Sequence, residues 1–134
     1  MKILLFGTSQ TKHIKEMFLR YGLEVVELNE ADYTKSLLSK IKSYIYSIKD
    51  VDYVYRIYNQ SKFNWRFLIA RVFGKKTISH WIGTDVLEEQ RNKNKIGTRI
   101  NRYVTFLNLA CSPLIKRELK DMGIDALEIP IVPT

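Results

Sequence analysis

The chain has 134 residues, of which 46% are hydrophobic and 27% are charged, a composition typical of one folded domain spanning residues 1–134. Lysine and arginine outnumber aspartate and glutamate by 22 to 14, so the net charge is +8 and the chain favours polyanionic partners. One cysteine and two histidines exclude an internal disulfide and a zinc signature. The apolar run Ile3–Phe6 is too short for an export signal, and no run approaches the ~18 residues of a membrane span. We therefore expect a cytoplasmic protein.

Two hydrophobic periods alternate along the chain. Short apolar and β-branched runs predict six strands, at residues 2–6, 23–28, 51–58, 76–80, 107–111 and 127–132. Helical spacing predicts five helices between them, at residues 11–22, 37–48, 64–73, 88–105 and 112–123. Repeated βαβ units predict an α/β fold, namely a Rossmann-like three-layer sandwich with a six-stranded, mainly parallel sheet and helices on both faces.

In such a sheet, ligands bind beyond the carboxyl ends of the strands. Polar residues lie at the carboxyl ends of three predicted strands, whereas the strands before them are apolar. These polar segments are residues 7–11, 59–61 and 80–85. In the first of these loops, Thr8 and Ser9 precede a helix, whose amino end could hold a phosphate or a sugar hydroxyl. An ordinary turn and helix cap explains this loop equally well, because the glycine patterns of dinucleotide and nucleoside triphosphate sites are absent.

The segment from His80 to Asp85 is the strongest candidate for a functional site. It places an imidazole, a glycine, a hydroxyl and a carboxylate within six residues, and Asp85 is the first acidic residue after an acid-free stretch from Tyr53 to Thr84. One interpretation is structural, with Asp85 capping the next helix and Glu88 three residues later completing the cap. The other is catalytic, since a carboxylate at a strand end can accept a proton from a hydroxyl. The two roles are compatible.

The predicted helix at residues 64–73 mixes large aromatic and basic side chains. One interpretation is an interfacial helix that faces an anionic membrane through the following residues: Lys62, Trp65, Arg66 and Arg71. The other is a helix buried against the sheet, as helices between parallel strands commonly are. No helix-turn-helix, RNP or zinc-finger pattern indicates nucleic acid binding. Cys111 has no base near it in sequence and is expected to be an inert, buried thiol.

Three segments carry a resemblance to a known family. They are the opening strand MKILLFG (residues 1–7), the block KTISHWIGTDVL (76–87), and the terminal region CSPLIKRELKDMGI (111–124) followed by LEIPIVP (127–133). Together they resemble the N-terminal domain of bacterial GT-B glycosyltransferases that act in surface polysaccharide assembly. In that family two Rossmann-like domains face each other across a cleft, and the N-terminal domain holds the acceptor.

The resemblance implies a role for each candidate residue. Acceptor-binding positions would be Thr8, Ser9, His80, Gly83 and Thr84. Asp85 would be the general base of an inverting enzyme; in a retaining enzyme it would orient the acceptor or cap the helix, and His80 would contact the donor sugar. No cofactor is expected in this domain, because the nucleotide-sugar donor would bind a C-terminal domain or partner subunit.

Without that donor-binding half, the domain should not transfer sugar alone. The implied acceptor is a lipid-linked sugar or polysaccharide, which would explain basic surfaces near the inner face of the cell membrane. The alternative is a non-catalytic module on a flavodoxin-like scaffold that binds a ligand or another protein, because such sheets host many functions.

Overall fold

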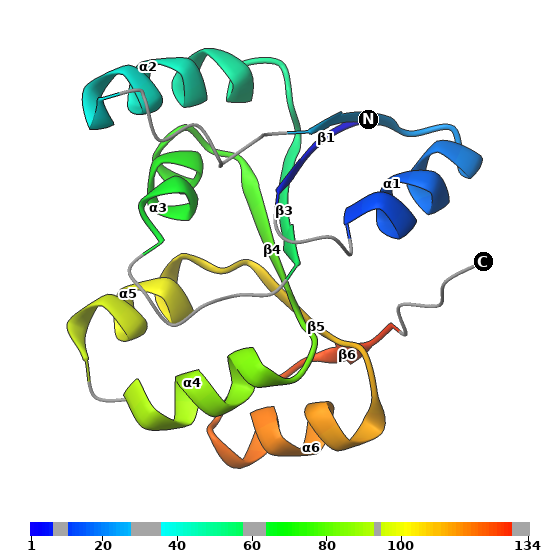
Figure 1. The fold of residues 1–134 in the computed structure, drawn as a ribbon, viewed down its shortest axis with the longest axis vertical. Coiled ribbons are helices and arrows are strands. Elements are labelled where there is room, and N and C mark those ends of the chain that lie inside the picture. Colours follow the sequence, from blue (N-terminus) through cyan, green and yellow to red (C-terminus); the bar gives the residue numbers. More distant parts are fainter. Residues whose placement is uncertain (7–10, 28–35, 58–63, 93–94, 130–134) are drawn as a thin grey trace.

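The computed structural model describes residues 1–6, 11–27, 36–57, 64–92 and 95–129 (Figure 1). Within these residues six parallel strands form one sheet in the order β2-β1-β3-β4-β5-β6. The strands are β1 (Lys2–Phe6), β2 (Glu24–Glu27), β3 (Tyr53–Ile57), β4 (Lys76–Trp81), β5 (Leu107–Ala110) and β6 (Leu127–Glu128). The predicted α/β class, with a parallel sheet between helical layers, is confirmed.

The described helices begin and end at residues that favour those positions. They are α1 (Thr11–Arg20), α2 (Leu37–Ile48), α3 (Trp65–Val72), α4 (Thr84–Asn92), α5 (Ile96–Val104) and α6 (Pro113–Asp121). The Oγ of Ser112 accepts a hydrogen bond from the amide of Ile115, and Pro113 occupies the first turn of α6, where no amide donor is needed. Asn64 caps α3 in the same manner through the amide of Phe67.

The single helix predicted over residues 88–105 is wrong. The structure contains α4 and α5 instead, and α4 begins at Thr84, next to the predicted cap Asp85 and four residues before residue 88. The physical reason is that both helices bury polar side chains. Helix α5 buries Thr98 and Asn101 beside Val104, at helical spacing. Because two of these three residues are polar, the pattern of apolar residues in the sequence does not indicate this buried stripe.

The sixth strand is also shorter than predicted. The described part of β6 is Leu127–Glu128, while the prediction extended to residue 132 and partly falls outside the described residues.

Five helices pack on one face of the sheet. Beneath α2, α3 and α5, the side chains of Leu4 and Val54 lie in a core with Tyr44, Phe67 and Val104. Beneath α4 and α6, a second core on this face contains the following residues: Trp81, Val86, Ala110, Ile115, Leu119 and Ile124. We call this side the covered face.

The opposite side, which we call the α1 face, is different. Its core consists of strand residues with Ile14 from α1, and the partly buried Met17 and Phe18 come from the same helix. No other helix among the described residues contributes to that core. Figure 1 shows α1 alone on this side, near β1 and β2. The two helical layers are therefore of unequal extent.

Candidate functional site

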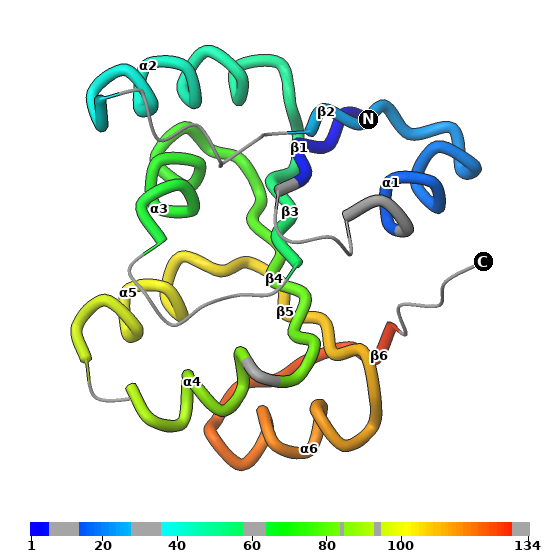
Figure 2. The backbone as a smooth tube through the Cα atoms, in the orientation of Figure 1, coloured from blue at the N-terminus to red at the C-terminus, as the bar shows by residue number. Residues whose placement is uncertain are grey.

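The carboxyl ends of β4 and β5 form the described part of the predicted site. Trp81 pairs with Ala110 in the sheet register, and the amide of Cys111 donates to the carbonyl of Trp81 at 3.2 Å. The turn Ile82–Gly83 after β4 therefore lies beside the start of the β5–α6 connection. Figure 2 follows the backbone through both connections at this end of the sheet.

Asp85 holds the turn together. Its Oδ1 accepts hydrogen bonds from the amides of Gly83 at 2.8 Å, Val86 at 3.0 Å and Ile82 at 3.2 Å, and its Oδ2 lies 3.2 Å from the Ile82 amide. The residue is fully buried. Gly83 has a φ of 146°, a conformation that glycine adopts with little strain. The carboxylate thus stabilises both the glycine turn and the first turn of α4, where the helix dipole also favours negative charge.

These contacts give Asp85 a structural role at the start of the helix, one residue inside it rather than at the cap. Its role as a general base stays a prediction. To act as one, the carboxylate would have to accept a proton while still surrounded by backbone amides.

His80 lies on β4, before the turn that Asp85 holds. Its side chain is on the α1 face and is fully buried. Its Nε2 donates to the carbonyl of Ile129 at 2.9 Å, so its Nδ1 is left to accept a hydrogen bond from the hydroxyl of Tyr55. Burial lowers the pKa of the imidazole below its usual value, and the hydrogen bond to Ile129 opposes part of that shift. Burial also raises the pKa of Tyr55 well above its usual value, so its hydroxyl keeps its proton.

In this arrangement the imidazole is a neutral link between β3, β4 and the residue after β6. Both of its nitrogens are occupied by protein groups. Its predicted contact with a sugar stays a prediction.

Glu89 and Arg102 form an ion pair that the sequence interpretation missed. Glu89 follows Asp85 by one helical turn and is 2% exposed, and its Oε1 lies 2.7 Å from the Nε of Arg102 on α5. Arg102 also donates from Nη1 to the carbonyl of Met122, after α6, at 3.3 Å. Burial raises the pKa of Glu89, Arg102 lowers it in part, and the charge of Asp85 raises it further.

A sequence signal for this pair exists. Two carboxylates four residues apart lie on one side of a helix, and such a pair needs a cation if that side is buried. The sequence interpretation considered Asp85 only as a helix cap or a base, and it did not follow the same side of the helix to Glu89.

Of the other predicted site residues, Thr8, Ser9 and Lys62 lie outside the described residues. Thr84 begins α4, directly between Gly83 and Asp85. The structure therefore brings Gly83, Thr84 and Asp85 into one turn.

Of the residues predicted to face a membrane, Trp65 and Arg66 are partly buried against the protein, whereas Arg71 is exposed near the end of α3. The ring of Trp65 contacts that of Tyr44 edge to face at a centroid distance of 5.5 Å, and the guanidinium of Arg66 lies 4.3 Å from the centre of the Trp65 ring. The Arg71 guanidinium lies 5.9 Å from the ring centre of Phe106. Only the end of α3 is open to solvent, with Val72 75% exposed.

Cys111 is partly buried, and its Sγ lies 3.7 Å from the carbonyl oxygen of Ile82. Burial and the charge of Asp85 raise the pKa of the thiol, which disfavours the nucleophilic thiolate. Among the described residues, no group of three or more His, Cys, Asp or Glu side chains could hold a metal ion. None of the described helices has the length and apolar character required to cross a bilayer.

Comparison with known proteins gives little further information. No protein-family model matches the chain, and no curated protein matches it in sequence. A solved structure of a conserved protein from Enterococcus faecalis V583 aligns with 97% of this chain and 91% of its own, at 7% sequence identity and a TM-score of 0.43.

The neutral state of His80 predicts acid sensitivity. In the unfolded chain a histidine titrates near 6.5, while in the folded protein its pKa is lower, so below about pH 6.5 the unfolded state binds more protons. The free energy of unfolding should therefore fall as the pH drops from about 7.5 to about 5.5. Urea unfolding of His80→Gln should lack this contribution, whereas His13→Gln, at the other histidine of the chain, should keep it. Equal pH dependence in wild type and His80→Gln would contradict the assignment.

The buried Glu89–Arg102 ion pair predicts that loss of Arg102 alone lowers the unfolding free energy more than loss of both charges. Arg102→Met should cost about 3–5 kcal/mol of unfolding free energy at neutral pH, because it leaves the Glu89 carboxylate buried without its cation. The cost should shrink as the pH falls and Glu89 takes up a proton, because burial raises the pKa of this carboxyl group, and it should also shrink in the double variant Glu89→Gln/Arg102→Met. Chemical denaturation measures both effects.

A matched control is the exposed pair Lys15–Glu27, whose side chains are 39% and 44% exposed. Lys15→Met should cost less than about 1 kcal/mol. Similar costs for the two pairs would show that Glu89 is solvated rather than buried.

Proposed function

We propose that this chain is the acceptor-binding domain of a GT-B glycosyltransferase, which transfers sugar from a nucleotide-sugar to a lipid-linked or polysaccharide acceptor. The observation that carries the proposal is the turn Ile82–Gly83–Thr84–Asp85 at the carboxyl end of β4, a central strand of the parallel sheet. Ligands of open parallel sheets bind beyond this edge. The resemblance of residues 76–87 to the corresponding loop of such enzymes supports the same position.

The geometry of the turn suits a sugar acceptor. Gly83 has no side chain, and an added Cβ would meet no atom within 4 Å, so the backbone has open space in front of it. Asp85 fixes the turn from inside through three amides. A fixed turn with open space in front can receive a hydroxylated ring with little reorganisation of the protein.

In the predicted arrangement, the nucleotide-sugar donor binds outside this domain. The carboxyl ends of β1 and β3 are neighbours at the point where the chain changes direction across the sheet, because β1 continues to β2 on one side and β3 to β4 on the other. The loops that follow them contain Thr8 and Ser9, and residues 59–61. We propose that these loops and the turn after β4 form the acceptor side of a cleft. The opposite wall would be a donor-binding domain or partner subunit.

The chain's charge supports a peripheral position on an anionic membrane, where a lipid-linked acceptor would be found. The net charge is +8, and the exposed end of α3 combines Arg71 with Val72 and Phe73. We therefore propose the inner face of the cell membrane as the location.

Strand order favours the second candidate, a non-catalytic binding module on a flavodoxin-like scaffold. Strands β2-β1-β3-β4-β5 follow the flavodoxin-like order, with β6 added at the edge. In the dinucleotide-binding order two strands lie on one side of the first strand, whereas in this sheet only β2 lies on that side of β1. Such a module would bind a phosphorylated ligand between the ends of β1 and β3.

Titration of the ¹⁵N-labelled chain distinguishes the two candidates. A short-chain prenyl diphosphate sugar should bind and shift the amide resonances of Ile82, Gly83 and Cys111, because these lie at the proposed acceptor edge. A nucleotide-sugar should bind at least about tenfold more weakly, since its domain is absent.

The same sugar without its lipid diphosphate, and flavin mononucleotide, serve as comparison ligands. Binding of the nucleotide-sugar or the flavin at this edge, without binding of the lipid-linked sugar, would contradict the transferase proposal.

A further inference from the structure

The net charge of the chain lies in one segment of its sequence. Residues 33–84 contain ten lysines and arginines but only two acidic residues, Asp50 and Asp52, a difference equal to the whole net charge of +8. The residues outside this segment contain twelve basic and twelve acidic side chains. Because α2, β3, α3 and β4 belong to residues 33–84, these elements carry the positive field of the protein.

Four of these cations meet at the amino edge of the sheet, where α2 and α3 end and β3 and β4 begin. The Nζ of Lys75 donates to the carbonyl of Lys49 at 3.2 Å, which joins the chain after α3 to the chain after α2. Arg71 and Lys76 both lie near the ring of Phe106. The guanidinium carbon of Arg71 is 5.9 Å from the ring centre, and the Nζ of Lys76 is 5.2 Å from it.

Apolar side chains are exposed among these cations. Val72, at the end of α3, is 75% exposed, and the following residue, Phe73, is 49% exposed. Phe106, which precedes β5, is 53% exposed. Exposed apolar side chains that are grouped together mark a site of interaction more often than single ones do. We call the following residues the basic edge: Lys49, Arg71, Val72, Phe73, Lys75, Lys76 and Phe106.

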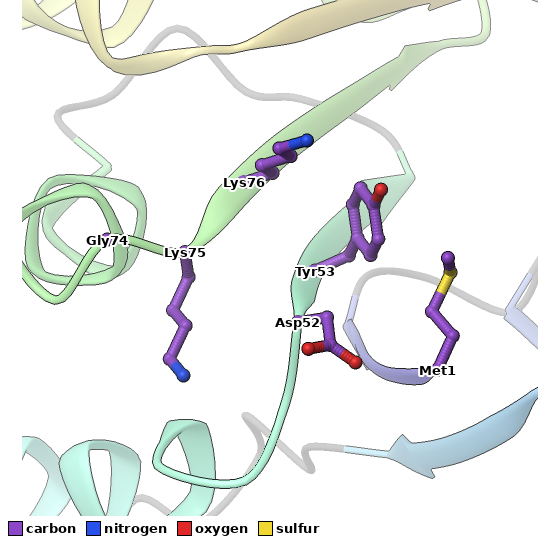
Figure 3. Close-up of a pocket in the computed structure, with 6 residues that line it drawn as sticks. All are labelled: Met1, Asp52, Tyr53, Gly74, Lys75 and Lys76. Atoms are coloured by element: carbon purple, nitrogen blue, oxygen red, sulfur yellow. The ribbon is translucent and has the colours of Figure 1, made fainter.

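A hollow of about 440 Å³ lies at this edge, lined by Met1, Asp52, Tyr53, Gly74, Lys75 and Lys76. Figure 3 shows the side chains of Lys75 and Lys76 directed away from each other at the start of β4. The Asp52 carboxylate accepts a hydrogen bond from the amide of Lys2. Positive charge is therefore present on both sides of β4, which favours contact through the edge of the sheet over contact through one of its faces.

We propose that the basic edge is the surface through which this protein binds an anionic phospholipid bilayer. Anionic headgroups attract each lysine or arginine near the bilayer surface, and apolar side chains beside these cations enter the boundary between headgroups and acyl chains. Val72 and Phe73 have this position, between Arg71 and Lys75.

Other occupants fit the basic edge less well. Nucleic acid is also a polyanion and would use the cations, but Val72 is aliphatic and offers no ring on which a base could stack. A second copy of the chain would bring the same cations into contact with each other, which costs free energy.

This inference deepens the membrane location proposed above, and it rests on the proposed function for that location only. The acceptor edge lies at the opposite ends of the strands, about 20 Å away along the six residues of β4. A bilayer at the basic edge therefore leaves the acceptor edge accessible. The acceptor titration contains no vesicles, so its failure and a failure of vesicle binding are separate results.

Sedimentation of the full chain with lipid vesicles tests the proposal. Vesicles of phosphatidylcholine and phosphatidylserine should bind the chain at least about tenfold more strongly than vesicles of phosphatidylcholine alone, and added salt should weaken this binding. Lys75→Gln/Lys76→Gln should lower binding to the anionic vesicles by about tenfold or more, because each cation near the surface contributes about fivefold. Circular dichroism checks that each variant is folded.

Helix α6 supplies matched control variants, because it lies outside residues 33–84 and exposes both charged and apolar side chains. Lys116→Gln/Arg117→Gln makes the same change in net charge and should lower binding by less than about threefold. Val72→Ser should weaken binding to the anionic vesicles by about threefold or more. Leu114→Ser, at a side chain that is 61% exposed, should leave that binding unchanged.

Three results would overturn the proposal. The first is equal binding to the two kinds of vesicle, or binding to neither, which would show that anionic lipid is not recognised. The second is an equal loss within either pair of matched variants, which would show that the binding surface is not the basic edge. The third is binding of single-stranded RNA in preference to the anionic vesicles, lost in Lys75→Gln/Lys76→Gln, which would assign the basic edge to nucleic acid.

Discussion

The carboxylate of Asp85 fixes the turn on which the carboxyl edge of this protein depends. It binds the amides of Ile82, Gly83 and Val86, and so sets the direction in which α4 leaves the sheet. The position of α4 in turn brings Glu89 to Arg102 on α5, and Arg102 reaches the chain after α6. One buried carboxylate therefore begins a series of contacts that relates three helices to the end of β4.

The all-parallel sheet imposes the second constraint. Because every strand runs in the same direction, all polar loops that follow the strands meet at one edge, and a site at that edge needs no residues from the opposite end. Every connection from β2 to β6 moves in the same direction across the sheet, so the helices of these connections lie on one face. The connection from β1 to β2 moves in the opposite direction and places α1 on the other face. The proposed acceptor edge follows from this connectivity.

The function proposed for Asp85 has to be compatible with its structural role. A residue that holds backbone amides can shape an acceptor site without touching the acceptor, by keeping the glycine turn open. For the same reason, a loss of activity after its replacement would not by itself identify a catalytic base. Binding of the acceptor and transfer of the sugar have to be measured separately.

Much of the fold follows from local patterns in the sequence. The strands, the apolar stripe of α2 and the Ser112–Pro113 start of α6 were predictable, because each depends on residues within one or two turns of one another. The division between α4 and α5 was not, because the buried stripe of α5 is partly polar.

The candidate site shows the same distinction. The position of Asp85 at a strand end and a helix start is a local feature, and it was predicted. The contacts of His80 with Tyr55 and Ile129, and of Glu89 with Arg102, join residues 13 to 49 positions apart. Such pairs depend on how the elements pack, and one sequence without its fold gives no measure of that packing.

Amide hydrogen exchange tests the role of Asp85 most directly. In the wild-type protein the Ile82 and Gly83 amides should exchange slowly, because the Asp85 carboxylate accepts their hydrogen bonds in a buried turn. In Asp85→Asn their protection should fall by about tenfold or more, while that of the core strand amide of Val54 changes little. Rapid exchange of both amides in the wild type, or unchanged protection in the variant, would contradict the conclusion that this carboxylate holds the turn.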